Sequence, residues 1–128
     1  MSADWRAVAK AAGYRVVGSE ITVDLWAGRR QTVSVDDRHA PDAIRLSSVI
    51  LGPNKTSQLA EGTPLEYAWE RNRLSDLMGF SVDTKGRLIG ESWIPLEGMT
   101  VEEFALHLDE VARVCDWHEL RLTGVDTY

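Results

Sequence analysis

Hydrophobic and polar positions alternate most clearly between residues 77 and 121, and this pattern predicts a β-hairpin followed by a long amphipathic helix. Apolar side chains recur at every second position across 78–82, as in a half-buried strand. A turn is predicted at Asp83 to Gly86, because Asp suits the first turn position and Gly86 can adopt the positive φ that closes a three-residue loop. The second strand is predicted from Arg87 to Pro95.

The turn also predicts the register of the hairpin. With three loop residues, Asp83 lies opposite Arg87, and this cross-strand pair of opposite charges contributes up to ~1 kcal/mol. The same register pairs Val82 with Leu88 and places the core side chains on one face, namely Met78, Phe80, Val82, Leu88 and Ile94. Ile89 and Trp93 fall on the opposite face of the hairpin.

The helix after the hairpin has a well-defined start. Thr100 and Glu103 fit a capping box, with Thr100 at the N-cap, and Met99 and Phe104 occupy the hydrophobic-staple positions. Apolar residues then follow at helical period and predict the buried face of this helix: Phe104, Leu108, Val111, Cys115 and Leu122.

The N-terminal half predicts a short helix over 3–12 and three strands, near 21–25, 31–35 and 43–51. A loop at 52–62 leads to a second capped helix, which starts at Thr63 and ends near Asp76. One face of that helix is predicted to carry Leu65, Ala68, Trp69 and Asn72. The order α-β-β-β-α-β-β-α indicates one α+β domain over residues 1–128, with helices packed on a largely antiparallel five-stranded sheet.

Composition restricts the class of protein. Apolar residues make up 44% and charged residues 27% of the chain, as in ordinary globular domains. No apolar run is long enough for a transmembrane helix, the N-terminus is too polar for a signal peptide, and one cysteine cannot form an internal disulfide, so we expect a cytoplasmic protein that does not contact membranes. The net charge of −6 comes from the C-terminal half, and an acidic chain disfavours nucleic acid as a partner.

The segment from Trp69 to Gly98 and the order of elements resemble the YbjN-like family of sensory transduction regulators, which in turn resembles the fold of class I type III secretion chaperones. The matching residues are Glu70–Leu74, Gly79–Asp83, Gly86–Leu88 and Ile94–Gly98. The resemblance implies a small acidic homodimer that binds a polypeptide partner, without catalysis and without a cofactor.

Two segments contain residue types found in metal or acid–base sites. Cys115 and His118 share a helix face, but His107 lies about 16 Å from His118 along the helix and cannot join them. Two ligands are too few for structural zinc, so we predict no metal site there. The segment Asp36–Asp42 lacks the spacing of a calcium loop and is interpreted as a solvated connection between strands, although a small metal-dependent enzyme using it is an alternative.

Apolar side chains outside the predicted core indicate an interface. On the last helix, Leu106, Trp117 and Leu120 lie opposite the core stripe, and Arg113 is placed to stack on Trp117. We therefore predict a partner or dimer interface formed by Trp93, Ile89, Leu106, Arg113, Trp117 and Leu120.

These patterns favour a non-enzymatic, chaperone-like or regulatory module that binds a polypeptide and forms a homodimer held mainly by apolar contacts. A toxin-neutralising or other regulatory partner protein would need the same kind of surface, and the sequence does not separate the two.

Overall fold

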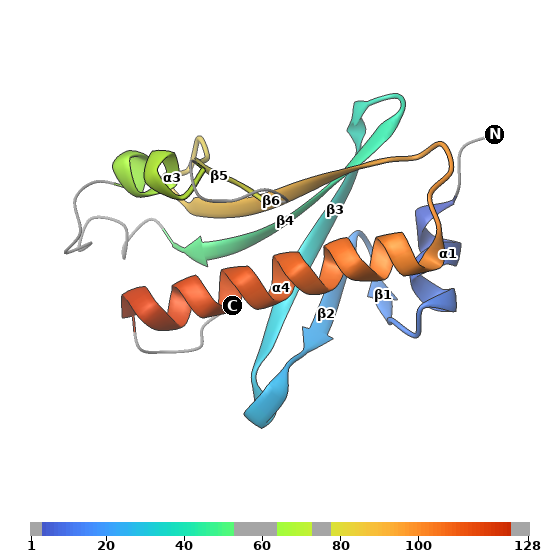
Figure 1. Ribbon diagram of the computed structural model, residues 1–128, viewed down its shortest axis with the longest axis horizontal. Coiled ribbons are helices and arrows are strands. Elements are labelled where there is room, and N and C mark those ends of the chain that lie inside the picture. The colour runs from blue at the N-terminus through green and yellow to red at the C-terminus, as the bar shows by residue number, and fades with distance from the viewer. Residues whose placement is uncertain (1–3, 53–63, 73–77, 124–128) are drawn as a thin grey trace.

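The structure is a computed structural model, and it describes residues 4–52, 64–72 and 78–123. A six-stranded sheet, with every neighbouring pair antiparallel, is covered on one face by a long C-terminal helix (Figure 1). The strands are β1 (Val16–Val17), β2 (Glu20–Asp24), β3 (Arg30–Ala40), β4 (Ala43–Leu51), β5 (Gly79–Val82) and β6 (Leu88–Pro95), in the spatial order β1-β2-β3-β4-β6-β5. The helices are α1 (Trp5–Ala11), α3 (Pro64–Asn72) and α4 (Val101–Thr123), with a 3₁₀ turn, η1, at Trp26–Gly28.

The α+β class and the antiparallel sheet agree with the sequence, but the predicted strand number was wrong. The sixth strand is β1, which pairs Val16 with Ile21 and Val17 with Glu20 at the edge of the sheet. Two residues are too few to show a period-2 pattern, so alternation alone could not reveal this strand.

The hairpin β5–β6 has the predicted register. Val82 pairs with Leu88 and Phe80 pairs with Gly90. In the turn, Arg87 Nε donates to Asp83 Oδ2 at 2.7 Å, and Gly86 has φ 79°. The local turn chemistry therefore fixes which face of the hairpin enters the core.

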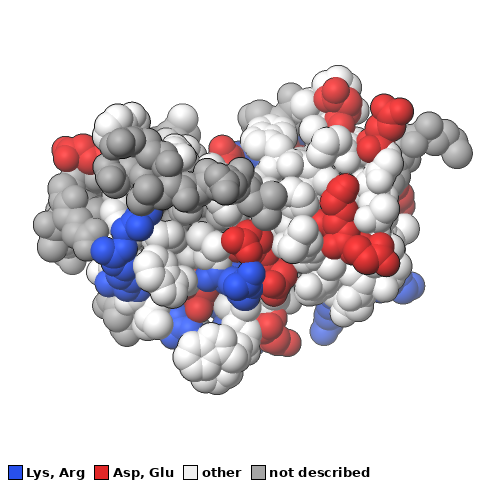
Figure 2. Space-filling model, in the orientation of Figure 1, with Lys and Arg blue, Asp and Glu red and all other residues white. Residues whose placement is uncertain are grey.

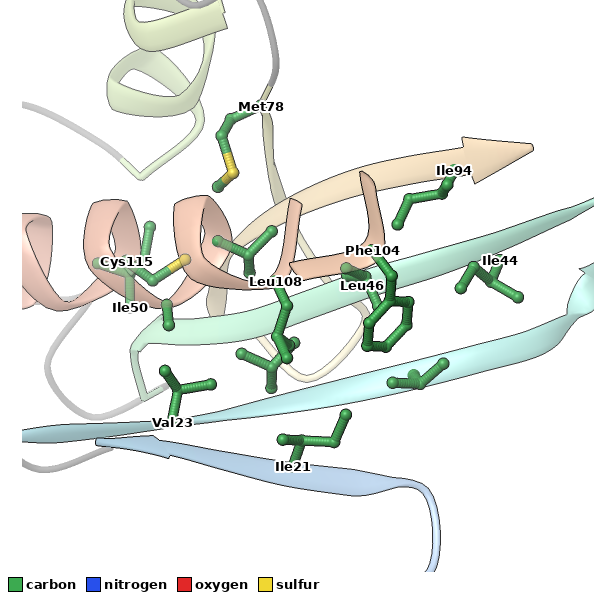
Figure 3. Packing of buried hydrophobic residues seen from close by; sticks show 14 of the residues in the cluster. Ile21, Val23, Ile44, Leu46, Ile50, Met78, Ile94, Phe104, Leu108 and Cys115 are labelled. Carbon is green, nitrogen blue, oxygen red and sulfur yellow. The ribbon is translucent and has the colours of Figure 1, made fainter. Parts of the chain in front are cut away.

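The core lies between α4 and the inner face of the sheet. Figure 3 shows Phe104, Leu108 and Cys115 of α4 directed toward side chains of β4, including Leu46 and Ile50. All five of these side chains are fully buried. The predicted cap is confirmed as well, because Thr100 Oγ1 accepts a hydrogen bond from the Glu103 backbone N–H at 3.0 Å.

Helix α3 packs beside β5, and only part of the face predicted to carry Leu65, Ala68, Trp69 and Asn72 is buried there. Tyr67 and Ala68 are buried, whereas Trp69 is 63% exposed. Asn72 ends the helix and uses both atoms of its side-chain amide on the backbone N–H and C=O of Phe80. This amide satisfies the polar groups that an edge strand would otherwise leave unpaired. The predicted cap at Thr63 and helix end near Asp76 lie outside the described residues.

The segment Asp36–Asp42, predicted as a connection, is mostly strand. Strand β3 continues to Ala40 with an irregularity between Asp36 and Ala40, and then turns tightly into β4. Its carboxylates have structural roles, since Asp36 accepts the Arg38 backbone N–H and Asp37 accepts the indole N–H of Trp5.

Candidate functional site

A hollow of about 360 Å³ lies between the β2–β3 connection and the C-terminal half of α4. We call it the tip groove. Its lining is mostly apolar and consists of Leu25, Trp26, Arg29, Arg113, Val114, Asp116, Trp117, His118 and Leu120. It combines a concave shape with exposed aromatic side chains, which is the usual form of a binding site.

The β2–β3 connection forms one wall of the tip groove because its backbone turns sharply. Ala27 has φ 60° and Gly28 has φ 75°, both in the left-handed region. The turn closes with a hydrogen bond of 2.7 Å from the Leu25 N–H to the Arg29 C=O. A left-handed conformation is costly for alanine. The turn that contains it leaves the side chain of Trp26 in solvent, where it is 76% exposed.

An ion pair fixes this wall to α4. Arg29 donates from Nε to Asp116 Oδ2 at 2.9 Å and from Nη2 to Asp116 Oδ1 at 2.8 Å. The two side chains are only 15% and 7% exposed, so the pair is largely removed from water. A bidentate guanidinium–carboxylate pair has a defined geometry, and the tip groove is therefore formed before any ligand arrives.

His118 borders the tip groove and connects α4 to α3. Its Nδ1 lies 2.6 Å from the Tyr67 hydroxyl, and its ring meets Trp117 edge to face with centroids 4.7 Å apart. Burial, and to a smaller extent the positive charges of Arg71 and Arg121, together lower the pKa of His118 to about 4. The imidazole is therefore neutral near pH 7, which suits its apolar surroundings.

The structure separates the predicted interface residues into two groups on opposite faces of the molecule. On the solvent face of α4, Leu106 is 59%, Trp117 53% and Leu120 37% exposed. Trp93 is 42% exposed but belongs to the outer face of the sheet, as its neighbour Ser92 points inward to His107. These residues therefore do not form one continuous patch.

Two details of the predicted interface were wrong. Ile89 lies on the predicted outer face but is only 5% exposed, so it offers little surface to a partner. Arg113 does not stack on Trp117. It binds Asp109 and Glu110 of its own helix, both at 2.7 Å, and the guanidinium over the Trp117 ring, at 5.5 Å, belongs to Arg121.

Trp26 and Trp69 are exposed aromatic residues that were not among the predicted interface residues. Trp26 stands in a short connection before Gly28, and an aromatic side chain in a tight turn is a signal that could have identified it. Trp69 gave no such signal, because the apolar pattern of its helix fits either face. A second, shallower hollow beside Trp69 is lined by Glu66, Ala68, Asn72, Phe80 and Ser81.

The candidate metal ligands are engaged elsewhere. Burial raises the pKa of the Cys115 thiol, His118 contacts the Tyr67 hydroxyl, and His107 Nδ1 lies 2.8 Å from the Ser92 hydroxyl. Across residues 4–52, 64–72 and 78–123, no group of three or more His, Cys, Asp or Glu side chains is arranged to hold a metal ion. In the same ranges, no helix has both the length and the apolar character needed to span a bilayer.

Solved structures share this fold. YbjN from E. coli aligns with a TM-score of 0.59 and 12% identity over 91% of this chain and 87% of its own. The Yersinia pestis type III secretion chaperone SycH, crystallised with a stable fragment of YscM2, aligns with a TM-score of 0.53 and 11% identity over 92% and 95%. A chain of the ExsC–ExsE complex aligns with a TM-score of 0.52 and 16% identity over 94% of both chains.

The predicted likeness to YbjN and to the type III secretion chaperones is thus confirmed at the level of the fold. No family model matches the sequence, and no curated protein matches it. Identities of 11–16% show a shared architecture, and a shared architecture does not determine function.

Proposed function

We propose that this chain is a non-enzymatic protein-binding module of the chaperone-like or regulatory kind, and that it holds a polypeptide segment in the tip groove. The observation that carries the proposal is the pair of exposed tryptophans, Trp26 and Trp117, on a concave apolar surface. Two proteins of the same fold were crystallised with polypeptides, SycH with a fragment of YscM2 and ExsC with ExsE, which supports a polypeptide as the ligand.

The energetics of the tip groove fit such a ligand. Covering one large apolar side chain contributes ~1.5–3 kcal/mol, and the two exposed indoles of Trp26 and Trp117 can gain much of this from an apolar side chain placed between them. The Arg29–Asp116 pair fixes the walls beforehand, which reduces the ordering cost of binding. Aromatic anchors of this type usually dominate the affinity of an interface.

Photo-crosslinking identifies the ligand and locates its site in one experiment. A photoreactive phenylalanine analogue at position 26 should capture a polypeptide, whereas the same analogue at position 93, on the opposite face, should not. With the captured polypeptide purified, Trp26→Ala should weaken binding at least about tenfold in calorimetry, as expected for a hot-spot residue. The matched control Trp93→Ala should leave the affinity within about twofold. Equal losses in both variants would contradict the tip groove as the binding site.

We further propose that the chain forms a homodimer. The support is the exposed apolar surface of α4, which an isologous contact can cover with a single patch. Because Trp93 and Trp117 lie on opposite faces, one two-fold interface cannot include both, and Trp93→Glu and Trp117→Glu should differ in their effect on dimerisation.

A further inference from the structure

Arg71, near the C-terminal end of α3, has a guanidinium group that lacks an acceptor. Its Nε is buried and makes no hydrogen bond, and no carboxylate in the part of the chain that the structure describes forms an ion pair with it. The guanidinium lies instead over the ring of Tyr67, 5.0 Å from the ring centroid. A cation–π contact stabilises the charge but accepts no N–H group, so a buried donor remains that an acceptor from outside the chain can satisfy.

A second guanidinium borders the same part of the molecule. Arg121 lies over the ring of Trp117, 5.5 Å from its centroid. The rings of Tyr67 and Trp117 both meet His118 edge to face, with centroids 5.7 Å and 4.7 Å apart. Because Trp117 and His118 line the tip groove and Tyr67 belongs to α3, the two arginines lie at the end of the tip groove that is next to α3.

The electrostatic field at this end of the tip groove is positive. The charges of Arg71 and Arg121 both lower the pKa of His118, and no carboxylate of the described residues raises it. Asp116, the only carboxylate among the described residues that line the groove, is already bound to Arg29 through both oxygens. Figure 2 shows the wider surface, with acidic side chains gathered over the N-terminal half of α4 and basic ones over its C-terminal half. On a chain of net charge −6, such a local positive surface can attract an acidic group that the rest of the chain repels.

We propose that Arg71 and Arg121 bind a carboxylate of the polypeptide held in the tip groove, so that this ligand carries Asp or Glu beside its apolar anchor. The inference rests on the proposed function and adds the chemistry of the ligand to it. Guanidinium groups bind carboxylates through paired, charge-assisted hydrogen bonds, which would use the buried Nε of Arg71. Trp117 and Arg121 are one helical turn apart, roughly 6 Å, which an extended polypeptide covers in about two residues. The expected ligand motif is therefore an apolar residue with Asp or Glu about two positions away.

Inorganic sulfate tests the anion site without the polypeptide. Sodium sulfate replaces sodium chloride at equal ionic strength, and the Nε–H signals of the arginines are followed by NMR. The Arg71 signal should shift and saturate, because a bound anion supplies the missing acceptor. Arg6 is the matched control, since its guanidinium also lies over an indole, that of Trp5 at 4.4 Å, but donates to the Gly18 C=O. An Arg71 signal that does not saturate, or an equal response of Arg6, would overturn the anion site.

The polypeptide captured through position 26 tests the ligand. Arg71→Gln and Arg121→Gln should each weaken its binding at least about tenfold in calorimetry. Arg6→Gln, on α1 at the opposite end of the molecule from the C-terminal end of α4 (Figure 1), should change the affinity less than about twofold. Arg121 is exposed, so its variant distinguishes a loss of binding from a loss of folding. Replacing the acidic residue of the ligand by its amide should weaken binding to the wild type, with little further loss in the Arg71→Gln variant.

The outcomes separate this inference from the proposed function. A captured polypeptide whose affinity depends on Trp26 but not on Arg71 would overturn the inference and leave the proposed function intact. Failure to capture any polypeptide would contradict the proposed function, and a saturable sulfate response would then still support the anion site. Loss of affinity after phosphatase treatment of the polypeptide would assign the anion to a phosphorylated residue and overturn the carboxylate.

Discussion

At the scale of single residues, burial separates two apolar side chains of α4 that are only two positions apart. Phe104 is fully buried between the helix and the sheet, and Leu106 is 59% exposed. We expect Phe104→Ala to lower the free energy of unfolding by ~3–5 kcal/mol, because it removes a buried ring and leaves a cavity. Leu106→Ala should change it by less than about 0.5 kcal/mol in the monomer. Urea titration measures both, and similar losses would show that the buried face of α4 is misassigned.

His118 provides a pH-dependent prediction. Its pKa falls from an ordinary value of 6.5 to about 4 in the folded chain, first through burial and then through nearby positive charge. The unfolded chain therefore binds more protons than the folded chain between these values, and His118 removes stability as the pH falls from about 6.5 to 4. Above pH 6.5 the imidazole is neutral in both the folded and the unfolded chain, so this loss of stability is absent.

The measurement is the free energy of unfolding against pH for wild type and for His118→Asn. Their difference should be constant above pH 6.5 and should shrink below it, with a slope that approaches about 1.4 kcal/mol per pH unit. Parallel curves down to pH 4 would show that the histidine is not held neutral. The sequence could not predict this property, because Tyr67 and Phe80, which enclose the ring, come from distant elements.

At the scale of elements, short-range chemistry was predicted well and long-range placement was not. The hairpin register and the α4 cap depend on residues within four positions of each other, Asp83 with Arg87 and Thr100 with Glu103, so the sequence contains all the information they need. The face of α3 that is buried depends on where β5 lies, and the helical pattern that grouped Trp69 with Ala68 had no access to that contact.

The close packing of α4 on β6 depends on Gly90. A Cβ at this position would lie 2.5 Å from Cys115 Sγ and 3.0 Å from Met78 Cε. Gly90→Ala should therefore destabilise the fold by ~1–3 kcal/mol through overpacking. Gly79→Ala is the matched control on β5, since its nearest neighbour would be Glu91 Cγ at 3.7 Å, an ordinary contact.

A double variant identifies the cause. Cys115→Ala removes the sulfur that a new Cβ would meet, so Gly90→Ala/Cys115→Ala should be more stable than the sum of the two single changes predicts. Strict additivity in chemical denaturation would mean that the cost of Gly90→Ala arises from the strand and not from the helix above it.

At the scale of the whole molecule, the candidate site is assembled from parts that the sequence keeps far apart. Arg29 and Asp116 are 87 positions apart, and neither lies in a motif that indicates a pairing. The predicted interface grouped residues by their expected exposure, although these residues belong to separate elements. It therefore placed Trp93 and Trp117 in one patch, whereas the sheet and α4 lie between them. The exposure of a side chain can be inferred from the periodicity of its own element. Which exposed side chains lie next to each other depends on how the elements pack in the fold.

The Arg29–Asp116 pair allows a prediction about the tip groove as a unit. Arg29→Ala leaves a carboxylate that is 7% exposed without its cation, and removing one partner of a buried pair costs ~3–5 kcal/mol. The apolar replacement Arg29→Met/Asp116→Leu removes both charges at similar volume and should be close to neutral in chemical denaturation. The double variant should also keep the groove walls in contact through packing alone, and so retain affinity for the captured polypeptide within about tenfold. If it folds normally and binds nothing, the ion pair itself contacts the ligand; if Arg29→Ala is neutral, the pair does not fix the β2–β3 wall to α4.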